Sequence, residues 1–294
     1  MIRAILISLF FVPALSWASA DHSDSPSCIP ANNLYYPVGM NFSGVTEQEF
    51  NDVLDRVAKY YEPIVNSQGA NLDIVRSWSS ATINARAWRT GSTWHIEMYG
   101  GLARHELVTA DGFALVACHE LGHHLGGHPR MGWAANEGQS DYWGSLKCLR
   151  RIWQEDDNLA IIENQKIEPS AAQKCDSQFK DASRNAICKR GAMAGLSLAK
   201  LLAKLGGTKT PDFDSPDTSV VTKTNNAHPA AQCRLDTYFH GSLCTAMYSK
   251  DTSDKDADEG VCSRKFGEEI GVRPLCWYKP SSSVQNKIQL TQNN

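Results

Sequence analysis

The amino-acid sequence predicts an α+β protein, in which a small group of short strands lies between helical segments. Runs rich in β-branched and aromatic residues follow one another over 72–78, 81–89 and 93–99. Apolar residues recur at helical spacing over about 46–66, 109–126, 136–152, 193–205 and 230–247. Strands that are grouped in this way, apart from the helices, are typical of the α+β class.

The first helix has a well-defined start. Thr46 and Glu49 have the spacing of a capping box, in which each side chain accepts a hydrogen bond from the other residue's backbone N–H. From Phe50 onward, apolar residues at helical spacing predict that the helix continues to about Asn66. We expect this apolar face to pack on the core, and we assign it no chemistry.

The two ends of the chain differ from the rest. Residues 1–20 combine a basic start, an apolar run and a small-residue cleavage site, which predicts a secretory signal peptide. Since no other run approaches the roughly 18 to 20 apolar residues of a membrane span, we expect a periplasmic or extracellular protein without one. Residues 280–294 form a polar tail.

Between these ends, composition divides the chain into three parts. The strands and most of the helices fall within 21–207, which we expect to form the main domain. Residues 208–227 lack periodicity and are rich in Asp, Ser and Thr, which predicts a loop or linker. The cysteine-rich segment 228–279 is expected to be helical and to pack on the main domain.

Nine cysteines lie beyond the predicted signal peptide, a content that suits an oxidising compartment. An odd number leaves at least one of them unpaired. We expect this to be Cys118, which lies in an apolar helix, while the other eight can form four disulfides, with Cys28 tying down the N-terminal arm. A structural zinc site made of cysteines is the weaker alternative, because the chain contains no Cys-x-x-Cys pair.

The strand predicted over 93–99 leads toward the next helix. Trp94, Ile96 and Met98 share one face of it, and His95, Glu97 and Tyr99 share the other. We expect an edge here to which an extended peptide adds as a further strand, with Ile96, Glu97 and Met98 as substrate-binding residues. An ordinary half-buried strand is the alternative.

The helix predicted over 109–126 contains a His-Glu-x-x-His motif, formed by His119, Glu120 and His123. Residues four apart project from the same face of a helix, so the two imidazoles can bind one Zn²⁺ ion. Glu120 between them is placed to take a proton from a water at the metal. Because the motif also arises by chance, it indicates a metal site only if the chain supplies a third ligand.

The next predicted helix supplies that ligand. Glu137 and Asp141 lie four residues apart, which places both carboxylates on one face. Glu137 is predicted to be the third metal ligand, and Asp141 to accept a hydrogen bond from the far nitrogen of a ligand histidine. Two histidines, a glutamate and a water make an open, catalytic zinc site; a solvated helix face is the alternative reading of the two carboxylates.

A metal site with three histidine ligands is another arrangement that contains the His-Glu-x-x-His motif. Its pattern continues His-x-x-Gly-x-x-His after the Glu, but Pro129 occupies the final position. His128, one residue earlier, remains the second choice for the third ligand. His124 is expected to be a helix-end or surface residue, and His105 a surface residue.

The residues around these motifs resemble a family. The block Asn136-Glu137-Gly138-Gln139-Ser140-Asp141 is similar to that of the glutamate zincins. Segments 84–87, 96–102 and 114–123, with the later His228-Pro229 and Arg234-Leu235, resemble the CAAX-prenyl-protease and HtpX-like metallopeptidases. The resemblance implies a minimal zincin-like fold, in which a small mixed sheet packs on the active-site helix and on a second, ligand-bearing helix. The absence of a predicted membrane span makes a soluble periplasmic relative the closer analogy.

These residues together predict an exported zinc metallopeptidase that acts on peptides or proteins, with Glu120 as general base. His228, at the start of the last predicted helix, is the candidate donor to the oxyanion; a loop histidine before a helix-initiating proline is the alternative. The net charge of −3 gives no reason to expect binding to nucleic acid. A zincin-fold protein that binds peptide or cell-envelope partners without cleaving them is the competing hypothesis.

Overall fold

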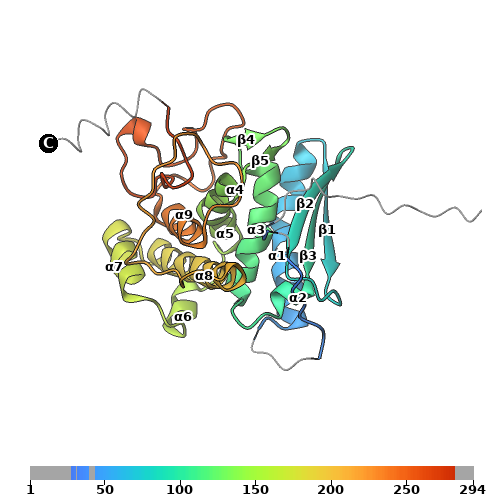
Figure 1. Ribbon diagram of the computed structural model, residues 1–294. Helices are drawn as coiled ribbons and strands as arrows, with labels where there is room; N and C mark the ends of the chain where they lie inside the picture. Colours follow the sequence, from blue (N-terminus) through green and yellow to red (C-terminus); the bar gives the residue numbers. More distant parts are fainter. Residues whose placement is uncertain (1–27, 31, 40–43, 282–294) are drawn as a thin grey trace, which may run out of the picture.

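The computed structural model describes residues 28–30, 32–39 and 44–281. The predicted signal peptide and nearly all of the predicted tail lie outside the described residues. The α+β class is confirmed: Figure 1 shows a small sheet at one side of the molecule and a larger group of helices at the other. In the described part of the chain, no helix has the length and apolar character needed to cross a membrane.

Three strands form a mixed sheet, with bounds β1 (Asn71–Ser77), β2 (Ala85–Thr90) and β3 (Thr93–Tyr99). β3 is the central strand, because it pairs in parallel with β1 and antiparallel with β2. β2 starts later than the predicted position 81. The residues just before it contact the N-terminal segment instead: Tyr36 N donates to Ala81 O at 2.7 Å, and Tyr35 forms an isolated bridge with Thr82.

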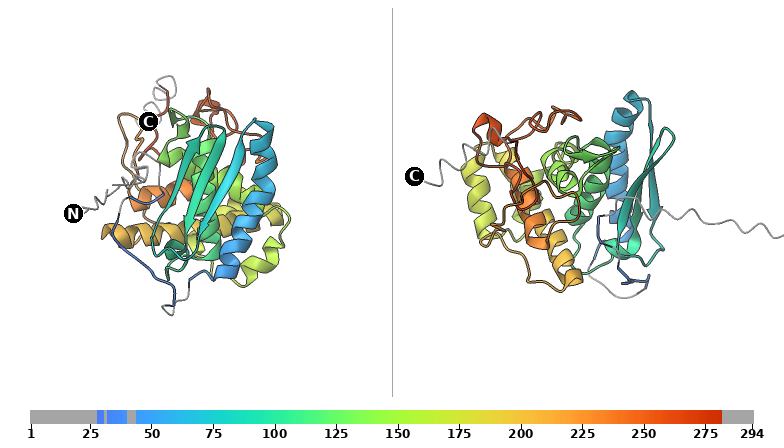
Figure 2. Two further views of the ribbon diagram at one scale, coloured as in Figure 1. Left: turned by 90° about the vertical axis from the view of Figure 1, so that its right-hand side faces the viewer. Right: turned by 45° about the horizontal axis from the view of Figure 1, so that its top comes forward.

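Two long helices, α1 (Glu47–Ser67) and α3 (Ala110–Leu125), pack against one face of the sheet, as Figure 2 shows. The capping box predicted at the start of α1 is confirmed. The short α2 (Gly100–Ala103) follows β3. α3 (Ala110–Leu125) lies between the sheet and the other helices, and every residue from Gly112 to His124 is buried. Its histidines and its glutamate therefore need partners inside the protein.

The helix predicted to start at Asn136 begins at Glu137. Asn136 is its N-cap, since its side chain accepts a hydrogen bond from Gln139 N. A hairpin of β4 (Arg130–Met131) and β5 (Ala134–Ala135) connects it to α3. Gly122 allows the two helices to approach, since a Cβ there would lie 2.9 Å from Cα of Ser140. The helix continues as α4 (Glu137–Trp143), the π-helical η1 (Gly144–Cys148) and α5 (Leu149–Ile152).

The helix predicted over 193–205 is much longer, and α8 spans Ala182–Gly206. Its earlier half packs against α9 (Ala231–Leu243) through small residues. At Gly191, for example, a Cβ would lie only 2.6 Å from Oγ of Ser242. Because glycine and alanine provide this contact, the apolar periodicity there is weak, and the sequence underestimates the helix.

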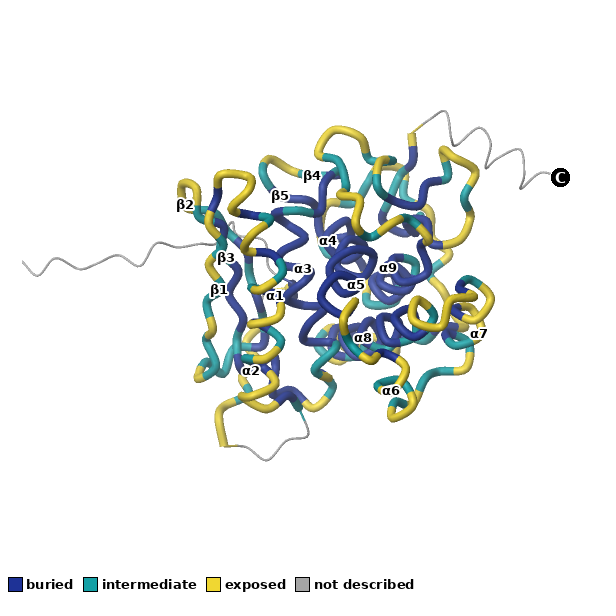
Figure 3. The backbone as a smooth tube through the Cα atoms, turned by 180° about the vertical axis from the view of Figure 1, so that it is seen from behind, coloured by how far each residue is buried: buried dark blue, intermediate teal, exposed yellow. Residues whose placement is uncertain are grey.

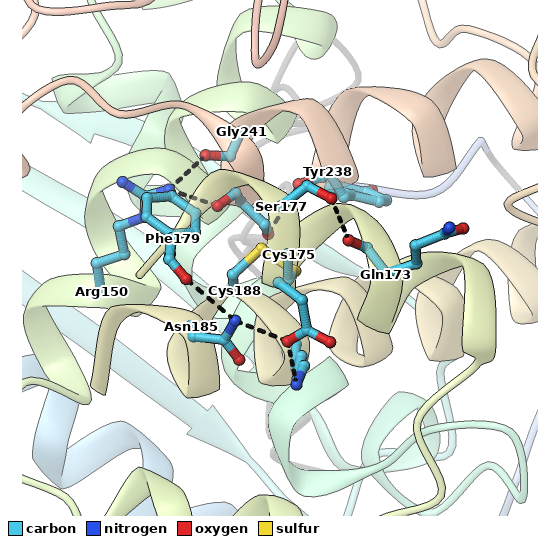
Figure 4. The surroundings of a disulfide bond; sticks show 12 residues. Arg150, Gln173, Cys175, Ser177, Phe179, Asn185, Cys188, Tyr238 and Gly241 are labelled. Carbon is cyan, nitrogen blue, oxygen red and sulfur yellow. Dashed lines mark hydrogen bonds and ion pairs between the residues drawn. A yellow bond between two sulfur atoms is a disulfide. The ribbon is translucent and has the colours of Figure 1, made fainter. Parts of the chain in front are cut away.

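Two short helices lie in the polar stretch before α8, namely α6 (Asn158–Glu163) and α7 (Pro169–Gln178). Figure 4 shows how α7 is attached to α8 by the Cys175–Cys188 disulfide. Asn185 of α8 donates to Asp176 Oδ1 at 2.9 Å and to Phe179 O at 3.4 Å. A covalent bond and polar contacts thus supplement the small apolar face of α7.

The segment predicted to be helical over 228–279 is helical mainly in α9, and the cysteine-rich end that follows is joined to that helix. The Cys233–Cys276 and Cys244–Cys262 disulfides attach it, and it contains only the short 3₁₀-helix η2 (Arg264–Phe266). The predicted linker 208–227 has no helix or strand and lies along this segment, with Val221 N donating to Leu275 O at 3.0 Å. Figure 3 shows that α3, α4, α5, α8 and α9 form the buried centre.

The expectation that Cys118 is unpaired is wrong. Cys118 of α3 forms a disulfide with Cys148 of η1, with 5.5 Å between the two Cα atoms. The unpaired thiol among the described residues is Cys28, which is buried and is held by hydrogen bonds instead of a disulfide. The sequence could not show this, because the contact between α3 and η1 is tertiary.

We expect one thiol per chain to react with Ellman's reagent when the protein is unfolded without reductant. Native protein should react far more slowly, since Cys28 is 0% exposed. The measurement is a thiol titration with and without denaturant, and Cys28→Ala is the control that should remove the signal. Three thiols in the unfolded protein would contradict the pairing of Cys118 with Cys148.

Candidate metal centre

Three side chains from two helices meet at one point. His119 and His123 project from α3, and Glu137 projects from the first turn of α4. Their candidate ligand atoms all lie within 4.8 Å of one another. His119 Nε2 is 3.2 Å from Glu137 Oε2, and His123 Nε2 is 3.7 Å from Glu137 Oε1. Tetrahedral zinc with bonds of about 2.0–2.1 Å holds its ligand atoms roughly 3.4 Å apart, so the spacing suits a metal ion.

Apart from one another and His228, these ligand atoms have no hydrogen-bond partner among the described residues. His119 Nε2, His123 Nε2 and Glu137 Oε2 are all buried and unsatisfied. Buried polar atoms are nearly always hydrogen-bonded, because leaving one unpaired costs about 1–3 kcal/mol. A cation between these three converging atoms would satisfy them, and the donor set fits a metal ion.

The other ring nitrogen of His119 is firmly held. His119 Nδ1 lies 2.7 Å from Asp141 Oδ1, and Arg234 of α9 donates to both oxygens of Asp141 at 2.7 and 2.8 Å. Burial raises the pKa of Asp141, but Arg234 and His119 outweigh it and lower that pKa to about 2. Asp141 is thus a carboxylate at neutral pH, and it orients the ring so that Nε2 faces the metal position.

His123 is oriented by the backbone instead. Its Nδ1 lies 2.9 Å from Ala135 O of β5, which leaves Nε2 facing the metal position. Burial lowers the pKa of His123 to about 4, although Glu137 opposes this effect. A neutral imidazole is the form that binds a metal, so the ring is ready to act as a ligand at neutral pH.

Glu120 lies beside the ligands and is 0% exposed. Its Oε1 accepts a hydrogen bond from the backbone N–H of Cys28 at 3.0 Å, while its Oε2 has no partner in the described structure. Burial raises the pKa of Glu120 from 4.5 to about 8, with His119 lowering it and Glu137 raising it further. A carboxyl group with such a pKa is suited to exchange protons near neutral pH.

This shift predicts a pH dependence of stability. In the metal-free protein, the folded state keeps a proton on Glu120 between pH 4.5 and about 8, whereas the unfolded chain has released it. The free energy of unfolding should therefore fall as the pH rises through this window. In Glu120→Gln the side chain does not titrate, so urea unfolding of the metal-free variant should show a weaker fall. Identical pH profiles for the two proteins would contradict the raised pKa.

His228 is brought to the site, although it precedes α9 rather than belonging to it. Its Nε2 lies 3.3 Å from Glu137 Oε2, and its side chain is 26% exposed. It is thus the most accessible group around the ligands. Its position beside Glu137 suits a side chain that contacts a bound ligand from the solvent side.

Three other histidines are placed differently from the predictions or outside the site. His124 is not a surface residue: it is stacked between Trp94 and Trp133, with ring centroids 5.3 and 5.0 Å away. His105 is buried as well, because it packs on Tyr36. His128, the second choice for the third ligand, belongs to none of the metal-binding groups found among the described residues.

The predicted peptide-binding edge at Ile96, Glu97 and Met98 is wrong. These residues lie in β3, which is hydrogen-bonded to a strand on each side and cannot accept another. The edge beside Glu120 is β2 and the residues just before it. Sequence alone could not decide this, because the order of strands in a sheet depends on tertiary packing.

Two residues of the site were not assigned a role from the sequence. Arg234 was noted only for its resemblance to a family segment, and Cys28 only as an anchor for the arm. Cys28 lies 92 residues from Glu120 in the sequence, and Arg234 lies 93 residues from Asp141. The one available signal was for Arg234, since the buried Asp141 requires a cationic partner as well as a histidine.

Known proteins give no further assignment. A comparison of the chain with protein-family models, with curated proteins and with solved structures finds no match in any of the three.

Proposed function

We propose that the protein is an exported zinc metallopeptidase of the glutamate-zincin type, resembling the CAAX-prenyl-protease and HtpX-like enzymes, and that it hydrolyses peptide or protein substrates. The observation that carries the proposal is the convergence of buried ligand atoms of His119, His123 and Glu137 within 4.8 Å of one another, next to Glu120, whose Oε2 has no hydrogen-bond partner among the described residues. Two imidazoles and one carboxylate form a typical open zinc site. The small sheet packed on α3, with α4 carrying Glu137, supports the zincin-like fold.

Zinc bound there would polarise a peptide carbonyl and make a water more acidic. Glu120 takes the proton of the attacking water and then passes it to the leaving amine; its Oε2 has no hydrogen-bond partner in the described structure, while Oε1 accepts a hydrogen bond from a backbone N–H. Asp141 and Ala135 O keep the two imidazoles in place. His228 donates to the developing oxyanion from the solvent side.

The four disulfides support export, because such bonds persist in oxidising compartments. The Cys118–Cys148 bond holds the α3–η1 contact together, and the Cys233–Cys276 bond attaches α9, the helix that carries Arg234, to the cysteine-rich end. A protein exposed to the extracellular or periplasmic medium benefits from such cross-links.

The test combines metal analysis with cleavage of a peptide library. We expect one zinc ion per chain, cleavage that stops after treatment with a chelator, and recovery on addition of zinc. His123→Ala should bind no zinc, and His105→Ala is the matched control, because His105 is buried outside the site. Zinc binding without any cleavage would favour the non-catalytic peptide-binding alternative, and absence of zinc binding would overturn the proposal.

A further inference from the structure

The candidate metal centre and the glutamate beside it are closed to solvent. The three residues of the His-Glu-x-x-His motif are at most 1% exposed, and Glu137 is 6% exposed. Hydrolysis requires the carbonyl carbon of a substrate to lie next to the water that Glu120 deprotonates. Cys28 bonds directly to this side chain, since its backbone N–H donates to Glu120 Oε1 at 3.0 Å. A peptide therefore reaches Glu120 only if Cys28 gives up its place.

Cys28 and Ile29 are held by hydrogen bonds to their backbone groups. Cys28 N also donates to Ala85 O at 3.3 Å, and Cys28 O accepts from Arg234 Nη1 at 2.6 Å. The Asn84 side chain accepts from Ile29 N and donates to Ile29 O, both at 3.1 Å. Because these contacts do not depend on the side chains of the bound residues, the same groups can bind the backbone of another extended peptide.

The rest of the N-terminal segment continues along the same edge of the sheet. Asn32 Nδ2 donates to Ile83 O at 3.1 Å, and Tyr36 N donates to Ala81 O at 2.7 Å. Residue numbers rise in the segment as they fall along the edge, so the two lie antiparallel, as an added peptide strand does. A substrate peptide that pairs with this edge competes with the segment for the same hydrogen bonds.

The side chain of Ile29 anchors the segment next to the site. It is 1% exposed, and it lines a cavity of about 270 Å³ together with Leu202 and Leu205 of α8 and Pro229 before α9. Contact with these apolar side chains removes Ile29 from water and so favours the bound position of the segment. Leu34, further along, is 46% exposed and adds little to this attachment.

We propose that Cys28 and Ile29 form an autoinhibitory contact: they occupy the peptide position beside Glu120, and a substrate binds only after they have moved away. The closed and open states differ by an exchange of noncovalent contacts, and no bond of the chain breaks. A substrate that binds only the open state shifts the equilibrium toward it. Its apparent affinity is lowered by the fraction of chains that are closed. This regulation rests on the proposed peptidase activity of the same site.

The experiment compares wild-type and Ile29→Glu full-length protein, both loaded with zinc, in cleavage of a library-derived peptide and in alkylation of the unpaired Cys28 thiol by iodoacetamide. A carboxylate in place of a buried isoleucine disfavours the closed state. We expect kcat/KM and the rate of alkylation of the native protein each to rise about tenfold or more. Leu34→Glu is the matched control, because it adds the same charge to an exposed position of the same segment, and it should behave as wild-type protein.

Ile29→Ala is a second, milder variant that serves if Ile29→Glu does not fold. It removes most of the anchor without adding a charge, so both rates should rise by a smaller factor. Autoinhibition requires cleavage and alkylation to increase together. If either rate stays at the wild-type value, or if cleavage is lost, the segment does not block the site and the proposal is overturned.

These outcomes are distinct from failure of the proposed function. Wild-type protein that binds zinc and cleaves peptides at the same rate as both Ile29 variants would exclude autoinhibition and leave the peptidase intact. If neither wild-type protein nor the variants bind zinc or cleave any peptide, both proposals fail together.

Discussion

Glu120→Gln should abolish peptide hydrolysis while leaving zinc binding unchanged. The amide keeps the size of the side chain and can still contact Cys28 N, but it cannot accept the proton of the attacking water. Loss of a general base typically lowers the rate by about 10²–10⁴-fold. Since the proposed ligands are His119, His123 and Glu137, the zinc content per chain should stay at the wild-type value.

The measurement is the initial rate on a library-derived peptide together with the zinc content of the same preparation. Glu62→Gln serves as the control, because it makes the same chemical change on the exposed side of α1. A Glu120→Gln enzyme with full activity would exclude the mechanism. Loss of zinc along with activity would mean that Glu120 is needed to build the site rather than to exchange protons.

Arg234→Leu should destabilise the protein strongly and weaken its metal site. Arg234 and Asp141 form a buried pair, with side chains 1% and 0% exposed. Removing the cation leaves an unpaired buried carboxylate, which costs about 3–5 kcal/mol. Because Asp141 also orients His119, we expect the zinc affinity to fall about 10–100-fold.

Urea unfolding and zinc titration test these two effects. Arg76→Leu is the matched control: Arg76 pairs with Asp55 at 2.6 Å, but at the surface, so its loss should cost no more than about 1 kcal/mol. Adding Asp141→Asn to Arg234→Leu removes the unpaired charge and should restore part of the stability, but not the zinc affinity. Equal destabilisation by Arg76→Leu and Arg234→Leu would show that burial of the pair has no special energetic role.

The sequence predicted the local features of the fold well. The capping box at Thr46 and the start of the second ligand-bearing helix at Asn136 both depend on residues within four positions of one another. The long helix α8 was underestimated, since its contact with α9 uses glycines, which carry no hydrophobic signal. Periodicity records large apolar side chains, not the close approach of two backbones.

The candidate site was predictable to the extent that helical spacing determines it. His119 with His123, and Glu137 with Asp141, are each four residues apart, so each pair had to share a helix face. The structure places both pairs at one point, through the close contact of Gly122 with Ser140. The pairing of Cys118 with Cys148 could not be predicted, because two distant elements meet there.

The sequence by itself determined which side chains make up the candidate site: two histidines and two carboxylates on two helices, with a glutamate beside the proposed ligands. Only the tertiary structure decided what surrounds them. It placed β3 at the centre of the sheet, paired Arg234 with Asp141, and brought the backbone N–H of Cys28 into hydrogen-bond contact with Glu120. The reason is physical. Spacing along a helix sets directions over one or two turns, whereas contacts between residues 90 or more positions apart depend on how the whole core packs.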